Sequence, residues 1–148
     1  AIIPTAGLGT RFLPITSAVP KEMFAIVDEP LLLHVVRGVA RAGIEDVVLI
    51  TGRRKTAIED LFDRHVELEE TLAKTGRTEL LQQLSDIRNT VNIISIRQKQ
   101  ALGLGHAIHM SKSVVGDDPF AVLLADELMV PTTPATHSGI GQLANGCL

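Results

Sequence analysis

The sequence predicts an α/β domain with a mostly parallel sheet, and three observations support this. Four short apolar runs alternate with segments of helical periodicity along residues 1–130. Each run is nearly continuous, which is typical of strands that helices cover on both faces. The length of 148 residues suits a single domain that buries about two-thirds of its unfolded surface. Strands and helices that alternate in one domain indicate right-handed crossovers between parallel strands.

The first helix is expected between the first two apolar runs. The four expected strands are the runs 1–4, 47–50, 93–96 and 120–124. Apolar residues at positions 32, 35, 36, 39 and 40 have the spacing of one helix face, so we predict a helix over 31–42. Pro30 suits the first turn of this helix, and Gly43 suits its C-terminal cap.

The rest of the chain contains more helices and then a change of composition. After the second strand a helix is expected near Thr56, and a charged helical stretch covers about 67–84 with a break near Gly76. Residues 131–148 are rich in Pro, Thr, Ser, Gly and Asn and contain no Asp, Glu, Lys or Arg. We therefore predict that residues 1–130 form the nucleotide-binding part of one α/β domain and that 131–148 form an irregular tail or linker.

The composition argues against several classes of function. The net charge of −3 and the absence of Trp and Tyr give no reason to expect binding to nucleic acid. The single cysteine, Cys147, cannot form an internal disulfide and fits a reducing compartment. No apolar run is long enough to cross a membrane. We expect a cytoplasmic protein.

The most informative motif follows the first strand. It is the loop Ala6-Gly7-Leu8-Gly9-Thr10-Arg11, and Lys21 comes ten residues after Arg11. Its glycines let the backbone approach a ligand closely and expose N–H groups to anionic oxygens. Arg11 adds a planar charged fork and Lys21 a mobile point charge, which suits a nucleoside triphosphate. The loop matches neither the dinucleotide-binding fingerprint nor the Walker A pattern. The alternative to a phosphate-binding loop is a surface turn with a solvated Arg and Lys.

Two further candidate positions follow later strands. Gln98, after the third strand, offers an amide donor and acceptor that suit a base edge, and Gly103 permits close backbone approach. A plain strand-to-helix connection is the alternative. Asp126, after the fourth strand, would face the same crevice as the glycine loop, where a carboxylate suits Mg²⁺ bound to phosphate oxygens. The alternative is a helix N-cap or turn residue.

Two other clusters have simpler interpretations. Arg53, Arg54 and Lys55 follow the second strand and are most simply a surface cluster, with a phosphate contact as the alternative. His106 and His109 are three residues apart and would share a helix face. No carboxylate or cysteine at a supporting spacing accompanies them, which argues against a zinc site.

Taken together, these loops resemble the bacterial UTP–glucose-1-phosphate uridylyltransferase family. The matching segments are 2–31, 42–69, 96–108 and 115–128. Within them, the sequences PKEM and RQK-x-x-LGLGHA separate this family from other sugar nucleotidyltransferases. The resemblance implies a three-layer α/β/α Rossmann-like nucleotide-diphosphosugar transferase fold with a mostly parallel sheet, of which this chain holds a part. It also implies transfer of a uridylyl group from UTP to glucose 1-phosphate, giving UDP-glucose and pyrophosphate.

The resemblance assigns the glycine loop to the nucleotide. It places Ala6 and Gly7 against the uracil and ribose, and Gly9 and Thr10 at the phosphates. Leu8 lies between them in the same nucleotide-binding loop. The resemblance further implies that Glu22, Gln98 and Gly103 read the uracil edge.

The resemblance also assigns the charged residues. Arg11 would hold the leaving pyrophosphate, Lys21 the α-phosphate, and Asp126 would bind Mg²⁺. These roles agree with the chemistry, because attack on the α-phosphorus gathers negative charge and needs positioning and neutralisation. The attacking phosphate is already ionised, so no side-chain nucleophile or general base is required.

The chain departs from the family in charge and in length. Ser17 stands where the family commonly has a lysine. The family runs to nearly twice this length, and the additional part would hold the sugar-binding residues and a second metal-binding Asp. Alternatives are therefore a non-catalytic UTP-binding fragment, a regulatory paralogue, or a transferase for another sugar 1-phosphate. A regulatory paralogue would be expected to lose the phosphate cations, whereas Arg11 and Lys21 are both present. A homo-oligomer is also expected.

Overall fold

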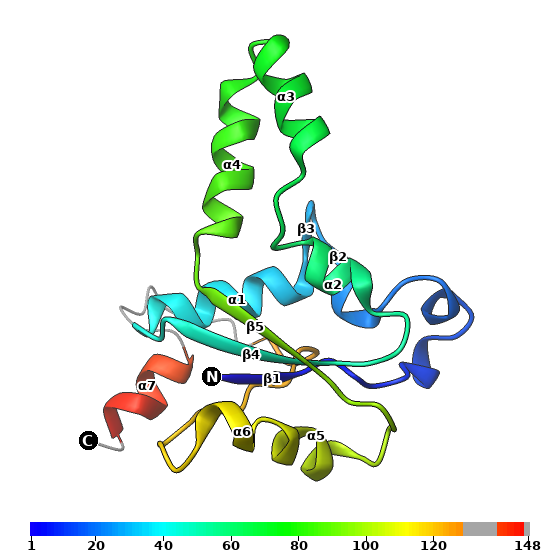
Figure 1. Ribbon diagram of the computed structural model, residues 1–148, viewed down its shortest axis with the longest axis vertical. Helices are drawn as coiled ribbons and strands as arrows, with labels where there is room; N and C mark the ends of the chain where they lie inside the picture. Colours follow the sequence, from blue (N-terminus) through cyan, green and yellow to red (C-terminus); the bar gives the residue numbers. More distant parts are fainter. Residues whose placement is uncertain (129–138, 147–148) are drawn as a thin grey trace.

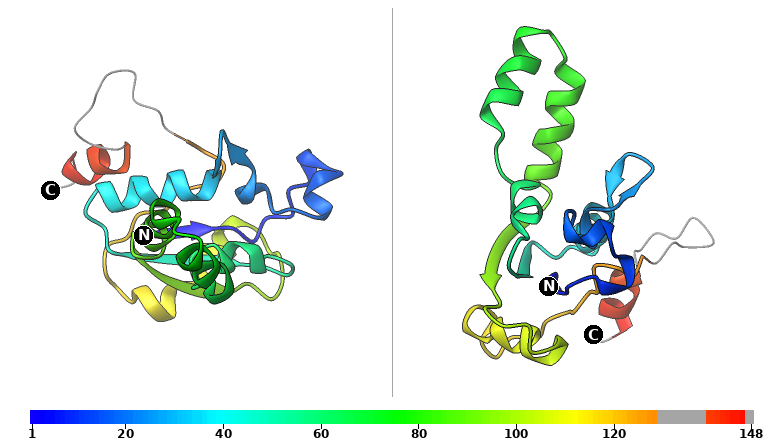
Figure 2. Two further views of the ribbon diagram at one scale, coloured as in Figure 1. Left: turned by 90° about the horizontal axis from the view of Figure 1, so that it is seen from above. Right: turned by 90° about the vertical axis from the view of Figure 1, so that its right-hand side faces the viewer.

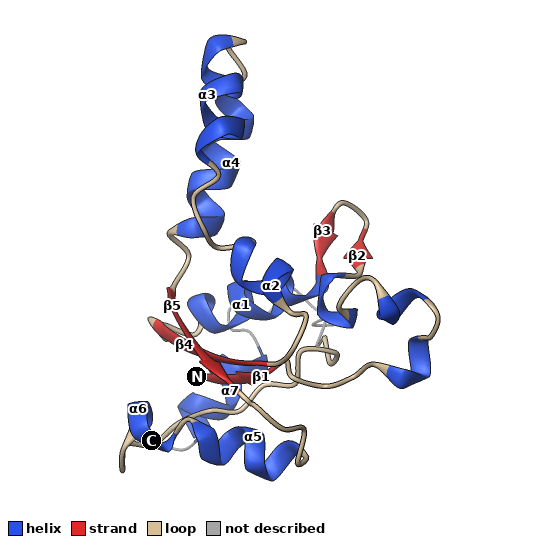
Figure 3. Cartoon of the chain, turned by 45° about the vertical axis from the view of Figure 1, so that its right-hand side comes forward, coloured by secondary structure: helices blue, strands red, loops and turns tan. Residues whose placement is uncertain are grey.

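A parallel sheet forms the centre of the molecule in the computed structural model, which describes residues 1–128 and 139–146. Its strands β1 (Ile2–Pro4), β4 (Asp46–Thr51) and β5 (Asn92–Arg97) pair in the order β1-β4-β5, and both pairings are parallel. A separate antiparallel hairpin contains β2 (Ala25–Ile26) and β3 (Glu29–Pro30) (Figure 3). The α/β class and the parallel sheet predicted from the sequence are confirmed.

Helices cover both faces of this sheet. The α-helices of the described residues are α1 (Leu31–Arg41), α2 (Thr56–Asp60), α3 (Val66–Lys74), α4 (Thr78–Arg88), α5 (Leu104–Met110), α6 (Lys112–Val115) and α7 (Gly139–Gly146). Helices α1 and α2 lie on one face, and α5 and α6 lie on the other (Figure 1). Helices α3 and α4 form a hairpin that extends away from the sheet (Figure 2). The arrangement is the three-layer α/β/α fold.

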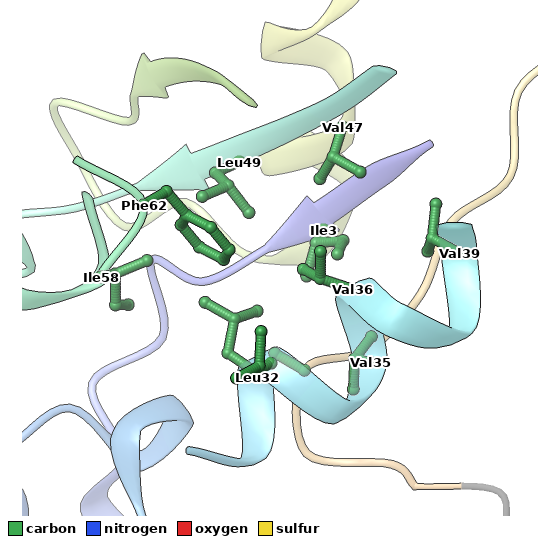
Figure 4. Packing of buried hydrophobic residues seen from close by; sticks show 11 residues of the cluster. Ile3, Leu32, Val35, Val36, Val39, Val47, Leu49, Ile58 and Phe62 are labelled. Carbon is green, nitrogen blue, oxygen red and sulfur yellow. The ribbon is translucent and has the colours of Figure 1, made fainter. Parts of the chain in front are cut away.

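Alternate residues of each strand enter two different apolar cores, which explains the continuous apolar runs. The core on the α1 side includes Ile3, Leu32, Val36, Val47, Leu49, Ile58 and Phe62 (Figure 4). The core on the α5 side includes Ile2, Val48, Ile50 and Ala107. Neighbouring residues of one strand thus point into opposite layers. Both faces of the sheet are covered by helices, so apolar residues can follow one another along a strand.

Helix α1 begins and ends close to the predicted positions. Pro30 precedes its first residue, Leu31. Beyond its last turn Gly43 has a φ of 78°, and its N–H donates to the carbonyl oxygen of Ala40 at 2.9 Å. The N–H of Ile44 donates to the carbonyl oxygen of Val39 at 3.3 Å. These two bonds form a Schellman cap, and the left-handed φ explains the glycine.

The fourth predicted strand, 120–124, is reduced to one parallel bridge between Ile2 and Val122. The N–H of Ile2 donates to Ala121 at 2.8 Å, and the N–H of Leu123 donates to Ile2 at 3.0 Å. The short strand β1 is the partner of this segment, which limits the length of the ladder. The segment nevertheless lies on the side of β1 opposite β4. The winding of the sheet therefore reverses at β1.

Part of the tail that we expected to be irregular is helical. Helix α7 lies beside α1, whereas residues 129–138 and 147–148 are outside the described part of the chain. The domain division near residue 130 remains a prediction. No helix in the described ranges 1–128 and 139–146 is both long and apolar enough to span a membrane.

Candidate active site

A pocket of about 370 Å³ opens where the loops leave β1, β4 and β5. In open α/β sheets, ligands bind beyond the carboxyl ends of the strands at the point where the winding reverses. Six of the predicted site residues line this pocket: Ala6, Gly7, Leu8, Thr10, Lys21 and Gln98. The structure thus brings the glycine loop, the first lysine and the expected base reader to one cavity.

The pocket is lined by five cationic side chains. They are Lys21, Arg53, Arg54, Lys55 and Lys99, and no Asp or Glu of the described residues accompanies them in the wall. A cavity of this charge suits a ligand that carries several negative charges. Ser17 also lines it.

Arg53 and Arg54 are exposed, as the interpretation of a surface cluster expects, whereas Lys55 is buried, and contact with a phosphate remains a prediction. All three line the pocket, because they follow β4 at its carboxyl end. The same rule that places Asp126 at this edge of the sheet applies to them. The order of strands and loops in the sequence therefore indicates that these cations lie near the pocket.

Gly9 shapes the loop, whereas Gly7 faces the cavity. Gly9 has a φ of 66°, and a Cβ atom there would lie 2.9 Å from Cγ2 of Thr16. The Thr16 hydroxyl donates to the carbonyl oxygen of Gly9 at 2.8 Å, which holds the two segments together. Gly9 itself does not line the pocket. At Gly7 a Cβ atom would meet Cε of Lys21 at 3.8 Å, an ordinary contact.

Gly9→Ala is expected to destabilise the protein by about 1–3 kcal/mol, because alanine must adopt a left-handed φ and displace Thr16. Gly7→Ala is the matched control, with an expected change in stability within about 0.5 kcal/mol. Thermal unfolding measures both. Since Gly7 faces the cavity, its variant is expected to weaken nucleotide binding instead. Equal unfolding temperatures for the two variants would contradict this distinction.

Lys21 and Asp126 connect two loops that are far apart in the sequence. Lys21, in the short 3₁₀ turn Lys21–Met23, donates from Nζ to Oδ2 of Asp126 at 2.7 Å. This hydrogen bond lowers the pKa of the Asp126 carboxyl below its ordinary value, with partial desolvation opposing the shift and Arg11 adding a smaller effect. The carboxylate is therefore ionised at neutral pH and lies beside the pocket lysine.

Arg11 is less closely placed than its predicted role requires. Its guanidinium lies 3.8 Å from Oδ2 of Asp126, but 83% of its side chain is exposed and it does not line the pocket. The structure therefore places Arg11 at the rim. Its contact with a pyrophosphate remains a prediction.

Glu22 lies in the interior and does not line the pocket. Its side chain is 0% exposed, and its Oε2 accepts a hydrogen bond from Nζ of Lys55 at 2.7 Å. The other oxygen, Oε1, is buried without a hydrogen-bond partner in the described residues. The contact of Glu22 with a base remains a prediction. Glu22 lies behind Lys55, which lines the pocket in its place.

Gly103 also lies outside the pocket wall. Its φ of 95° turns the chain between β5 and α5, and its carbonyl oxygen accepts a hydrogen bond from Nε2 of Gln98 at 3.3 Å. Gly103 thus contacts the base-reading candidate instead of the cavity. Direct contact of Gly103 with a base remains a prediction.

The fold and the pocket together define a doubly wound α/β protein of the kind that binds phosphorylated ligands beyond its strand ends. The chain belongs to the nucleotidyl transferase family, whose model matches residues 1–136.

Relatives within this family have a more specific name. The chain is 55% identical over 135 residues to the UTP–glucose-1-phosphate uridylyltransferase YngB of Bacillus subtilis. This match covers 91% of the chain and 46% of the relative. The chain is also 50% identical over 145 residues to a UTP–glucose-1-phosphate uridylyltransferase of Staphylococcus haemolyticus, covering 98% of this chain and 49% of that protein. The chain thus spans about half the length of these curated relatives.

A solved structure agrees with this assignment. The UTP-bound UGPase from Acinetobacter baumannii matches with a TM-score of 0.81 and 51% identity, over 84% of this chain and 44% of the other. The resemblance inferred from the sequence motifs is confirmed at the level of the family.

Proposed function

We propose that the complete protein that carries this chain transfers a uridylyl group from UTP to glucose 1-phosphate. The observation that carries the proposal is the pocket beyond the strand ends, where the glycine loop, Gln98 and five cations meet. Such a cavity offers backbone N–H groups and positive charge to a triphosphate, and an amide to its base. The names of the relatives support uridine as the nucleoside and glucose 1-phosphate as the acceptor.

The proposed reaction is an in-line displacement at the α-phosphorus. An ionised oxygen of glucose 1-phosphate forms a bond to that phosphorus, the bond to the β-phosphate oxygen breaks, and pyrophosphate leaves with the electron pair. Lys21 would neutralise charge on the α-phosphate, and Arg11 would hold the pyrophosphate at the rim of the pocket. Fixed charges of this kind stabilise a transition state without reorganisation of solvent.

Asp126 fits the requirement of a Mg²⁺ ion. It is ionised, and its side chain is 28% exposed beside the pocket. Mg²⁺ characteristically takes one or two carboxylates and completes its shell with phosphate oxygens and water, so one carboxylate on this chain is a suitable donor set. The ion would supply further neutralisation of the phosphates. Asp126 would then be shared between Lys21 and the metal.

The alternatives from the sequence remain open to test. They are a non-catalytic UTP-binding fragment, a regulatory paralogue, and a transferase for another sugar 1-phosphate. The retained cations of the pocket favour catalysis over a regulatory role. A cytoplasmic location and assembly as a homo-oligomer remain predictions from the sequence.

Calorimetric titration of the complete protein with UTP, CTP, ATP and GTP in the presence of Mg²⁺ tests the nucleotide. We expect UTP to bind more tightly than ATP, because Gln98, the residue that we propose to read the base, lies in the pocket wall. Equal affinities for UTP and ATP would defeat the uracil assignment. Pyrophosphate release with glucose 1-phosphate and with galactose 1-phosphate then tests the acceptor. Binding of UTP without release would favour the non-catalytic alternatives.

A further inference from the structure

The backbone and the side chain of Gln98 both make hydrogen bonds within the protein. Its backbone N–H donates to the carbonyl oxygen of Thr51 at 2.8 Å, which continues the ladder between β4 and β5 by one residue. Only 6% of the residue is exposed, yet it lines the pocket. The side chain is therefore almost enclosed by the protein, and the direction of its amide group matters for any ligand.

Two neighbours determine which end of the Gln98 amide faces them. Nε2 lies 3.3 Å from the carbonyl oxygen of Gly103 and 2.8 Å from Nδ1 of His106. A carbonyl oxygen can only accept, so the Gly103 side must receive the NH₂ group. The two hydrogens of Nε2 are then directed to Gly103 and to an unprotonated Nδ1 of His106. The contact with His106 is the shorter of the two.

This arrangement leaves the acceptor end of the amide for the ligand. Oε1 of Gln98 makes no hydrogen bond within the described residues and is not among their buried unpaired atoms, so it remains accessible. Uracil presents an N–H donor at N3, whereas cytosine presents a lone pair at the same place. An amide fixed with its oxygen outward therefore complements uracil and opposes cytosine.

We propose that His106 is a positioning residue that sets the preference for uracil over cytosine by fixing the amide of Gln98. The inference rests on the proposed function, since it concerns the base of the same nucleotide. His106 stands in the first turns of α5, the helix that Gly103 precedes. That helix anchors the Gly103 carbonyl too, because the N–H of Ala107 donates to it at 3.1 Å.

The helix thus holds both acceptors that orient Gln98. Without Nδ1 of His106, the amide keeps only the longer contact with Gly103, and the outward NH₂ orientation becomes accessible. A hydrogen bond of this kind contributes a modest net free energy, so its loss is expected to change the ratio of kcat/KM for UTP over CTP by roughly three- to tenfold.

The experiment compares two substitutions of His106 in the complete protein. His106→Phe keeps a ring of similar shape but has no acceptor, and we expect it to lower the UTP-to-CTP ratio of kcat/KM. His106→Asn places an amide oxygen near the position of Nδ1, and we expect it to restore most of the ratio. His109→Ala is the matched control, because His109 is an exposed histidine of the same helix. Its ratio is expected to equal that of the unaltered protein.

The outcomes separate this inference from the proposed function. An unaltered protein that prefers UTP, together with a His106→Phe variant of the same ratio, would overturn the inference and leave the function standing. Equal losses for UTP and CTP in both His106 variants would show a structural role and would also overturn it. An unaltered protein without preference for UTP would overturn the uracil assignment itself, and the inference with it.

Discussion

Lys21→Ala in the complete protein is expected to lower kcat for UDP-glucose synthesis by roughly 100- to 1,000-fold, as for the loss of one preorganised charge-stabilising group. Lys21 lines the pocket, only 17% of its side chain is exposed, and Asp126 holds its ammonium at 2.7 Å. The charge is therefore fixed before the reaction begins. Because negative charge increases at the α-phosphate in the transition state, the effect should fall mainly on kcat.

Lys112→Ala is the control for this prediction. Lys112 is an exposed lysine at the start of α6 and does not line the pocket. Its removal should leave kcat unchanged, while it alters the net charge of the protein by the same amount. Pyrophosphate release at saturating UTP gives kcat, and thermal unfolding checks that both variants are folded. A folded Lys21→Ala protein with kcat within threefold of normal would remove Lys21 from the catalytic residues.

The sheet and its covering helices were predictable because their signals are local. Apolar runs such as 47–50 are continuous, and their alternate residues enter two separate cores. The end of α1 was predictable from Gly43, since a left-handed φ at a Schellman cap favours glycine. The extent of the strand at 120–124 was harder to predict. Its apolar residues fit a strand, but the length of its ladder depends on its partner β1, which has only three residues.

The approximate location of the site was predictable from topology, but its internal contacts were not. The carboxyl-edge rule placed Asp126 near the glycine loop, and its carboxylate is bonded to Lys21. The same rule could have included Arg53–Lys55. The bond between Gln98 and His106 depends on the side-chain directions of a strand end and a helix. No pattern of residue types specifies such a pair.

Glu22 shows the same limit most clearly. Its neighbour Lys21 faces the pocket, whereas Glu22 points into the interior and meets a lysine 33 residues further along the chain. The family resemblance assigns both residues to the nucleotide. The 3₁₀ turn that contains them directs their side chains to different environments. The resulting pair, Glu22 with Lys55, leads to a prediction about stability.

Lys55→Met is expected to destabilise the complete protein by about 3–5 kcal/mol, as for the removal of one partner from a buried ion pair. The substitution keeps an unbranched apolar stem but leaves the carboxylate of Glu22 without its cation. Glu22 is 0% exposed, and one of its oxygens already lacks a hydrogen-bond partner in the described residues. The penalty therefore comes from a buried charge that nothing neutralises. Urea unfolding followed by circular dichroism measures it.

The double variant Glu22→Gln/Lys55→Met separates this cause from a simple loss of packing. It contains the same methionine but replaces the buried carboxylate by a neutral amide of the same shape. We expect it to recover most of the lost stability, because replacement of both charges removes the uncompensated one. The recovery is a coupling free energy between the two positions, which lie in contact.

Lys74→Met provides the matched control, because Lys74 pairs with Glu70 on the surface of α3 at 3.7 Å and both side chains are largely exposed. Water screens that pair, so its loss should cost at most about 1 kcal/mol. The unaltered protein and Lys74→Met should therefore be the most stable, the double variant less stable, and Lys55→Met the least stable. If Lys55→Met and Lys74→Met cost the same, Glu22 is not a buried charge that depends on Lys55 for its neutralisation. Glu22 would then return to consideration as a residue that contacts the base directly.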